Sequence, residues 1–227
     1  MTDRHSLAIP ANADPIDALL KKIRLAIEAG ADWIQIREKD LTAGQLLNLT
    51  RQAAAAADES SKTRPLAGTR IFMNDRFDVA LATAANDLLA AAGVHLGGES
   101  LPVEQVVRWL RGGNAPPKFQ VGVSCHSIDQ AREAEQSGAD YIFFGPVFDT
   151  PSKRTFGSPQ GLQRLGEVCR SIQIAVIAIG GIEESNAQDC IRAGASGVAA
   201  IRLFQDAAHA DELRAFVSTL HAGEAST

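Results

Sequence analysis

Two cations and two carboxylates end a run of residues that is otherwise typical of a buried strand. The run WIQIREKD (33–40) begins with tryptophan and two isoleucines and ends in Arg37, Glu38, Lys39 and Asp40. Guanidinium and ammonium groups bind phosphate-like anions through charge-assisted hydrogen bonds. The same four residues could instead form a solvated turn held by salt bridges, so an anion site here needs complementary groups from elsewhere in the chain.

Other apolar runs are also followed by polar residues. Asn74 and Asp75 follow one such run, Ser124 ends a second, and Lys153 comes shortly after a third. Asp75 suits a magnesium site, because Mg²⁺ needs only one or two protein carboxylates besides phosphate oxygens and water. An aspartate in this position could equally cap the helix that follows it.

A glycine pair and a later helix start indicate a phosphate site. Gly180 and Gly181 end a buried run and allow the backbone to approach a ligand closely. Ile201 and Arg202 follow the last apolar run, where a helix begins and its N–H groups can bind an anion. The two features together resemble the phosphate site that barrel enzymes build after their last two strands.

These residues can act together only if the fold brings the ends of the runs to one face. The expected strands are 5–9, 33–37, 70–73, 93–96, 120–124, 141–145, 175–180 and 197–201. The expected helices, rich in Ala and Leu, are 16–30, 42–58, 76–84, 102–111, 128–137, 160–171, 185–193 and 207–222. Eight alternations predict an α/β fold, a single (β/α)₈ TIM barrel over residues 1–227. An open doubly wound sheet is the alternative.

The barrel makes a specific prediction about where the chemistry lies. Active sites of this fold lie at the carboxyl ends of the strands. Arg37, Lys39 and Lys153 would then converge there, although they are far apart in the sequence. His95 lies within an apolar run and is expected in the core, whereas His126 is equally consistent with the site and with loop structure.

Local signals support several helix ends. The spacing Thr-x-x-Gln predicts capping boxes at residues 42–45 and 127–130, the second with Ser in place of Thr. Gly30, Gly138 and Gly194 each precede an expected strand, and we expect them in the left-handed conformation at helix ends.

Composition and charge exclude several classes. The net charge of −5 argues against a general nucleic-acid or membrane-surface binder. No apolar stretch approaches the length of a membrane span, and the N-terminal residues do not resemble a secretory signal, so we expect a cytoplasmic protein. Three widely spaced cysteines predict free thiols. The sequence admits a homo-oligomer but does not determine the oligomeric state.

The motifs together resemble a known family. QIREKD, NDRFDVAL, GVHLGGESLP, VGVSCHS, ADYIFFGPVFDTPSK, IAIGGI and GASGVAAI are similar, in order and spacing, to the motifs of thiamine phosphate synthases. The resemblance covers about residues 17–205. It implies a (β/α)₈ barrel that joins 4-amino-2-methyl-5-(diphosphooxymethyl)pyrimidine to a thiazole phosphate. Diphosphate leaves, and the reaction uses Mg²⁺ and small-molecule substrates alone.

The resemblance also implies roles for individual residues. Residues that match the pyrimidine diphosphate site are Gln35, Arg37, Lys39, Asn74, Ser124 and Lys153. Glu38 is a further expected substrate-binding residue, and Asp75 matches a Mg²⁺ ligand. Residues that match the thiazole phosphate site are Thr150, Pro151, Ser152, Gly181, Ile201 and Arg202. Arg37, Lys39, Ser124 and Lys153 are the expected catalytic residues.

Three positions depart from the family pattern, namely Ser100, Arg202 and Ser152, where threonine is common. Ser100 stands where an acid usually supplies a second metal ligand, and Arg202 replaces a serine. Pro146 replaces the histidine of the related thiazole tautomerases, which favours the synthase. The alternative functions are a thiazole phosphate tautomerase and a barrel that binds thiamine precursors without turnover.

Overall fold

The computed structural model describes residues 1–63, 68–84, 91–150 and 158–224. The chain divides into two units. The first unit consists of Met1–His95, Pro116–Phe119 and Phe204–Ser218, and the second of Leu96–Ala115, Gln120–Leu203 and Thr219–Thr227.

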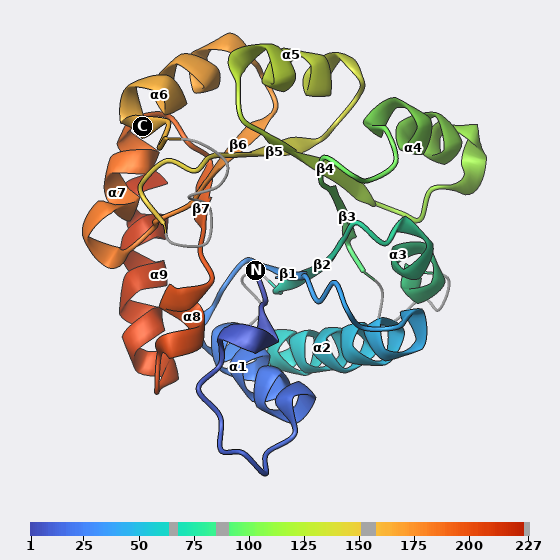
Figure 1. Ribbon diagram of the computed structural model, residues 1–227, viewed down its shortest axis with the longest axis vertical. Coiled ribbons are helices and arrows are strands. Elements are labelled where there is room, and N and C mark those ends of the chain that lie inside the picture. Colours follow the sequence, from blue (N-terminus) through green and yellow to red (C-terminus); the bar gives the residue numbers. More distant parts are fainter. Residues whose placement is uncertain (64–67, 85–90, 151–157, 225–227) are drawn as a thin grey trace. The chain divides into compact units, whose positions relative to one another are not determined.

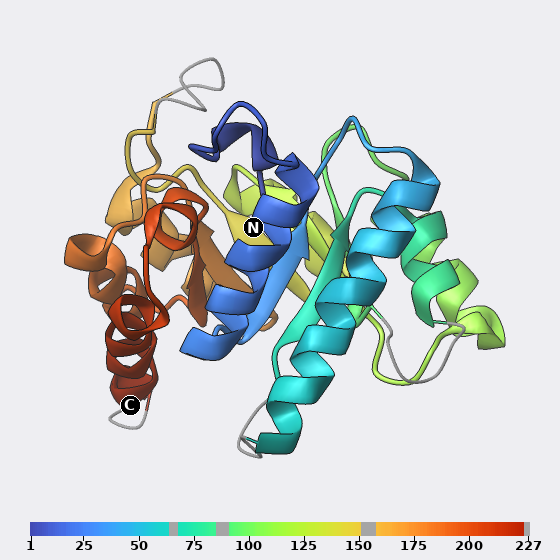
Figure 2. The ribbon, with the colours of Figure 1, turned by 90° about the horizontal axis from the view of Figure 1, so that it is seen from below.

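The first unit carries the strands that end in the charged motif. Its elements are η1 (Arg4–Ser6), α1 (Pro15–Ala29), β1 (Trp33–Ile36), α2 (Ala43–Thr63), β2 (Arg70–Asn74), α3 (Phe77–Ala84) and most of β3 (Gly93–Leu96). The strands are parallel, and β2 pairs with both β1 and β3. Helices α1 and α2 pack side by side, and α2 also packs on α3 and β2 (Figures 1 and 2).

Two further helices contribute to the first unit, namely most of α8 (Arg202–Asp206) and of α9 (Ala210–Glu224). Ala29 at the end of α1 packs in a buried cluster with Ala207 and Leu213. Residues from both ends of the chain therefore share one small core.

The second unit holds four parallel strands that pair in sequence order. Its elements are α4 (Val103–Trp109), the π-helical η2 (Leu110–Asn114), β4 (Gln120–Cys125), α5 (Ile128–Gln136), β5 (Tyr141–Phe144), α6 (Gly161–Ser171), β6 (Ala175–Ile179), α7 (Glu184–Arg192) and β7 (Gly197–Ala199). Helices α5, α6 and α7 follow one another along this sheet (Figure 1). All four residues of β5 are buried, as expected for a strand covered on both faces.

Local sequence explains several of the element boundaries. The side chain of Asp14 accepts hydrogen bonds from two N–H groups at the start of α1, where Pro15 has no N–H to satisfy. The predicted box at the start of α2 is confirmed, since the N–H groups of Thr42 and Gln45 each reach the other's side chain. The box before α5 is half right, because the side chain of Gln130 accepts from a different N–H group.

The three predicted helix-end glycines are confirmed. Gly30, Gly138 and Gly194 have φ of 93°, 90° and 106°, in the region where a side chain would be strained. Three free cysteines are confirmed as well, of which Cys125 and Cys190 are buried. No helix in the described part of the chain is long and apolar enough to cross a membrane. The predicted location and oligomeric state stay predictions.

The first predicted strand is wrong. Residues 5–9 contain the end of the short 3₁₀ helix η1 and then irregular chain. The side chain of Asp3 accepts from the N–H of His5, and the hydroxyl of Ser6 donates to the carbonyl of Asp3. Such local bonds from short polar side chains compete with strand pairing.

Thr2 makes hydrogen bonds to the end of β1 that a neighbouring strand would otherwise have made. Its N–H donates to the carbonyl of Gln35 at 2.9 Å, and its hydroxyl accepts from the N–H of Arg37 at 2.9 Å. A residue in a parallel strand pairs with its neighbour in the same way, except that its own carbonyl accepts the second bond. A single residue thus pairs with the end of β1.

The fold class is nevertheless the predicted one, with seven strands in the described residues rather than eight. Strands and helices alternate, and within neither unit does the strand order reverse as it does in a doubly wound sheet. That residues 1–227 form a single domain stays a prediction.

Candidate functional site

A chain of side-chain hydrogen bonds links the ends of β1 and β2. The amide nitrogen of Gln35 donates to Asn74 Oδ1 at 2.7 Å, and Asn74 Nδ2 donates to Asp75 Oδ2 at 2.6 Å. Gln35 is only 4% exposed, and its Oε1 has no hydrogen-bond partner among the described residues. A buried amide oxygen without a donor costs free energy, and a ligand N–H is one group that can satisfy it.

Asp75 adopts an unusual backbone conformation. Its φ is 60°, in the left-handed region that residues with a Cβ rarely occupy. Its N–H donates to the carbonyl of His95 at 2.8 Å, which holds it in this conformation. Strained residues of this kind cluster at functional sites. Helix α3 begins at Phe77, so Arg76 rather than Asp75 occupies the position before the helix.

The two carboxylates of the charged motif are both bound by Arg4. Arg4 Nη1 lies 2.9 Å from Glu38 Oε2 and 2.7 Å from Asp40 Oδ1, and Nη2 reaches the other Asp40 oxygen. The backbone N–H of Arg4 is also shared between the two oxygens of Glu38, at 3.2 Å each. Hydrogen bonding to Asp40 raises the pKa of Arg4, and the guanidinium in turn lowers the pKa of Asp40.

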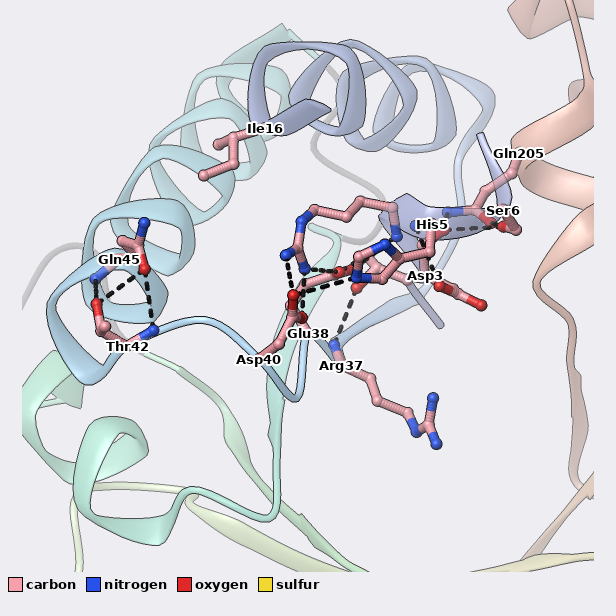
Figure 3. A network of polar contacts seen from close by, with 12 residues as sticks. Asp3, His5, Ser6, Ile16, Arg37, Glu38, Asp40, Thr42, Gln45 and Gln205 are labelled. Carbon is pink, nitrogen blue, oxygen red and sulfur yellow. Dashed lines mark hydrogen bonds and ion pairs between the residues drawn. The ribbon is translucent and has the colours of Figure 1, made fainter. Parts of the chain in front are cut away.

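The two cations of the motif are not paired with these acids. In Figure 3 the side chain of Arg37 points away from the carboxylates of Glu38 and Asp40. Neither Arg37 nor Lys39 makes a side-chain hydrogen bond or ion pair with any residue that the structure describes. Arg37 is half-buried and Lys39 is exposed. The structure therefore does not show a solvated turn salt-bridged within the motif, because the acids pair with Arg4 and Glu38 is buried. Arg37 and Lys39 are left without an ion pair to a described residue.

In the second unit, the glycine pair forms a tight turn after β6. Gly180 and Gly181 have φ of 96° and 66°. A Cβ on Gly181 would lie 2.5 Å from the carbonyl oxygen of Asp149, so only glycine fits here. The side chain of Asn186 donates to the carbonyl of Gly181 at 2.9 Å and so ties the turn to the start of α7.

The other predicted site residues of the second unit lie at or after strand ends. Ser124 is half-buried near the end of β4, Thr150 is buried, and Ile201 and Arg202 lie after β7, with Arg202 exposed as the first residue of α8. Pro151, Ser152 and Lys153 lie outside the described residues.

Three further positions bear on the predictions. The hydroxyl of Ser100 accepts from the N–H of Gly97 at 2.8 Å and so helps close the loop after β3. The ring of His126 donates to the carbonyl of Gly145 at 2.5 Å, which favours loop structure for this residue. His95 is 2% exposed, and its expected place in the core is confirmed.

Sequence reasoning missed Arg4 and Thr2. Both precede the motif by more than thirty positions, with separations of 34 residues between Arg4 and Glu38 and 35 between Thr2 and Arg37. No spacing rule connects them to the motif, and the wrongly predicted strand at 5–9 concealed the turn that places Arg4. An unexplained arginine near the start of the chain was the only available signal.

Comparison with known proteins identifies relatives over most of the chain. Residues 7–204 match the family model described as thiamine monophosphate synthase. A putative thiamine-phosphate synthase of Geobacter sulfurreducens is 40% identical over 88% of this chain and 83% of its own. A thiamine-phosphate synthase of Chlorobium luteolum is 35% identical over 99% of each chain. The solved thiamine phosphate pyrophosphorylase of Pyrococcus furiosus superposes with a TM-score of 0.75, at 31% identity over 96% of this chain and 94% of that one.

Proposed function

Because the chain belongs to the thiamine monophosphate synthase family, we propose that it joins a pyrimidine diphosphate to a thiazole phosphate in a Mg²⁺-dependent reaction. Diphosphate is the leaving group, and thiamine phosphate is the product. The observation that carries the proposal is the end of β1, where Arg37 and Lys39 have no acidic partner among the described residues while both acids beside them are bound by Arg4.

Arg37 and Lys39 bind the diphosphate in this proposal. A guanidinium fork and a mobile ammonium group together match the many oxygens of a diphosphate. Their interaction strengthens as the bond to the pyrimidine methylene carbon breaks, because negative charge accumulates on the departing group. Ser124 and Lys153 add further diphosphate contacts on the strength of the family resemblance.

Gln35 recognises the pyrimidine through a hydrogen bond in this proposal. Its buried Oε1 lacks a donor among the described residues, and the exocyclic amino group of an aminopyrimidine supplies one. Asn74 fixes the orientation of this amide, because it accepts from the Gln35 nitrogen. A pyrimidine without the amino group would leave the oxygen unsatisfied and bind more weakly.

Asp75 is the residue that would hold Mg²⁺. Its carboxylate is a hard oxygen ligand, and Asn74 orients it through a 2.6 Å hydrogen bond. No group of three or more His, Cys, Asp or Glu side chains in the described residues could hold a metal, so the donor set fits an ion that takes its other ligands from diphosphate and water. When bound, the ion neutralises charge on the leaving diphosphate.

The second substrate is an anion too, and the second unit offers a turn for its phosphate. Gly180 and Gly181 present backbone where no side chain fits, and the backbone near Ile201 and Arg202 leads into α8. The thiazole nitrogen then attacks the carbon from which diphosphate has departed. No protein nucleophile is needed, and the chain contributes positioning and electrostatic stabilisation.

The direct test is a product assay with a matched pair of variants. Purified protein, both substrates and Mg²⁺ should yield thiamine phosphate by mass spectrometry, and EDTA should abolish it. Asp75→Asn should lose at least about a hundredfold in kcat/KM, or ~2.7 kcal/mol of transition-state stabilisation. Asp78→Asn, which removes an exposed acid three residues further along, should retain turnover.

Two outcomes would refute the proposal in different ways. Full activity in EDTA or in Asp75→Asn would exclude the metal role of Asp75. No product, with both substrates bound in a calorimetric titration, would identify a protein that binds thiamine precursors without turnover.

A further inference from the structure

We propose that Arg4 is a positioning residue of the diphosphate site. By binding Glu38 and Asp40, it prevents these acids from pairing with the cations that hold the anion and from repelling the anion itself. The inference rests on the proposed function, since it assumes that Arg37 and Lys39 bind diphosphate. It adds a residue from the N-terminal segment that does not touch the substrate.

The charges at the end of β1 show why such a residue is needed. Arg37 through Asp40 carry no net charge, which is a poor arrangement for a multiply charged anion. With Arg4 included, the five side chains carry a net charge of +1. Binding of both acids by one arginine also determines which way the charges point, with the acids toward Arg4 and Arg37 away from them (Figure 3).

Burial makes the pairing with Glu38 the important one. The side chain of Glu38 is 1% exposed and that of Arg4 is 11% exposed, whereas Asp40 is 53% exposed. An ionised carboxylate that is shielded from water requires a partner, and removing the partner costs much more than breaking a surface pair. Without Arg4, the cations that the charged motif leaves for Glu38 are Arg37 and Lys39 themselves. Glu38 would then compete with diphosphate for them.

Arg4 is held in place before any substrate binds. The segment that carries it is anchored on α8 by Gln205, whose side chain is 6% exposed. Gln205 donates to the carbonyl of Asp3 at 3.1 Å and accepts from the hydroxyl of Ser6 at 2.6 Å (Figure 3). These bonds lie on either side of Arg4 in the sequence, so its position is set by the fold. Charges fixed in advance bind an anion without a cost for reorganisation.

The prediction about Glu38 changes accordingly. The family resemblance suggested a substrate contact, and that stays untested. The carboxylate of Glu38 points toward Arg4, and both of its oxygens accept from the backbone N–H of Arg4. In this inference, the carboxylate of Glu38 is neutralised by Arg4 and does not contact the anion.

Calorimetric titration of the full-length protein with inorganic diphosphate and Mg²⁺ tests the inference. The variants are Arg4→Met, Arg4→Lys and the double variant Arg4→Met/Glu38→Gln. We expect Arg4→Met to raise the Kd about tenfold or more, since it leaves a buried negative charge beside the anion site. Glu38→Gln removes that charge, so the double variant should return to within about threefold of the wild-type Kd, as should Arg4→Lys.

Arg214→Met is the matched control. Arg214 pairs with Asp211 and lies 3.7 Å from Glu28, so it too joins acids from two segments of the first unit. Its loss should leave the Kd for diphosphate unchanged.

The results separate the two proposals. Wild-type protein that does not bind diphosphate refutes the proposed function and this inference with it. Wild-type binding with an unchanged Kd in Arg4→Met refutes the inference alone. Equally weakened diphosphate binding in Arg4→Met and in Arg4→Met/Glu38→Gln would also refute the inference. Arg4 would then only stabilise the N-terminal segment, since removing the charge of Glu38 would make no difference. Should Arg4→Met fail to fold, a tenfold loss in Arg4→Lys or in the double variant would decide against the inference.

Discussion

Gly181→Ala should destabilise the protein by about 2–5 kcal/mol. The φ of 66° at this position is left-handed, which costs a residue with a Cβ about 1–2 kcal/mol. The new Cβ would also lie 2.5 Å from the carbonyl oxygen of Asp149 and 2.7 Å from Cβ of Phe148. Relieving such contacts in packed structure costs about 1–3 kcal/mol more. For a chain of this length, the melting temperature should fall by about 4–20 °C.

Substitutions at two other glycines separate the backbone cost of a positive φ from the steric cost of the added Cβ. Gly161 has a φ of 73° but open space around its Cβ position, so Gly161→Ala should show the backbone cost alone, about 1–2 kcal/mol. Gly44 lies in the first turn of α2 with open space and no positive φ, so Gly44→Ala should be neutral or stabilising by up to about 1 kcal/mol.

Urea denaturation and thermal melts of the three variants beside the wild type provide the measurement. The order of stability should be Gly44→Ala, then Gly161→Ala, then Gly181→Ala. A Gly181→Ala protein as stable as Gly161→Ala would show that the turn relaxes away from Asp149. The contact between the new Cβ and Asp149 would then add nothing to the destabilisation, and the claim that only glycine fits would be wrong.

Three further predictions concern buried and paired groups. Burial raises the pKa of the Cys125 thiol to about 12, so a thiol reagent should label it only after unfolding. Unfolding restores the ordinary pKa of 9.0. The free energy of unfolding should therefore fall as pH rises above 9.0, because only the unfolded chain then loses the thiol proton. Asn74→Ala removes the acceptor of the buried Gln35 amide and should lower the free energy of unfolding by about 1–3 kcal/mol, measured in urea. Folding lowers the pKa of Asp40, so its pairing with Arg4 stabilises the protein above the ordinary value of 3.8 and this contribution is lost as pH falls. Between about pH 5 and pH 3, Arg4→Met should therefore lose less stability than the wild type, and an identical pH profile would contradict that pairing.

Much of the fold could be predicted because its signals are local. Buried runs such as YIFF and helix ends such as Gly30 specify their own structure through side-chain burial and backbone freedom. The error at residues 5–9 has a physical cause. The apolar residues there form a strand only with a partner, and Asp3 and Ser6 give the backbone local hydrogen bonds instead.

The candidate site also has features that the sequence predicts and features that it does not. The cations at the end of β1 and the aspartate after β2 could be predicted, because their positions follow from strand ends. The pairing of acids and bases could not be predicted from the sequence. Glu38 and Arg37 are neighbours, yet the partner of Glu38 is Arg4, which precedes it by 34 residues. Ion pairing depends on which side chains the fold brings together, and adjacency in sequence says little about it.

The contact that Thr2 makes with β1 has a consequence for association. Unpaired backbone groups along a strand are a template on which another molecule can add a strand, and such edges lead to aggregation. Thr2, itself 5% exposed, occupies one carbonyl and one N–H of the chain at the end of β1. Because Thr2 already uses this carbonyl and this N–H, another chain cannot pair with them, and a threonine outside the sheet closes this end of β1 to strand addition.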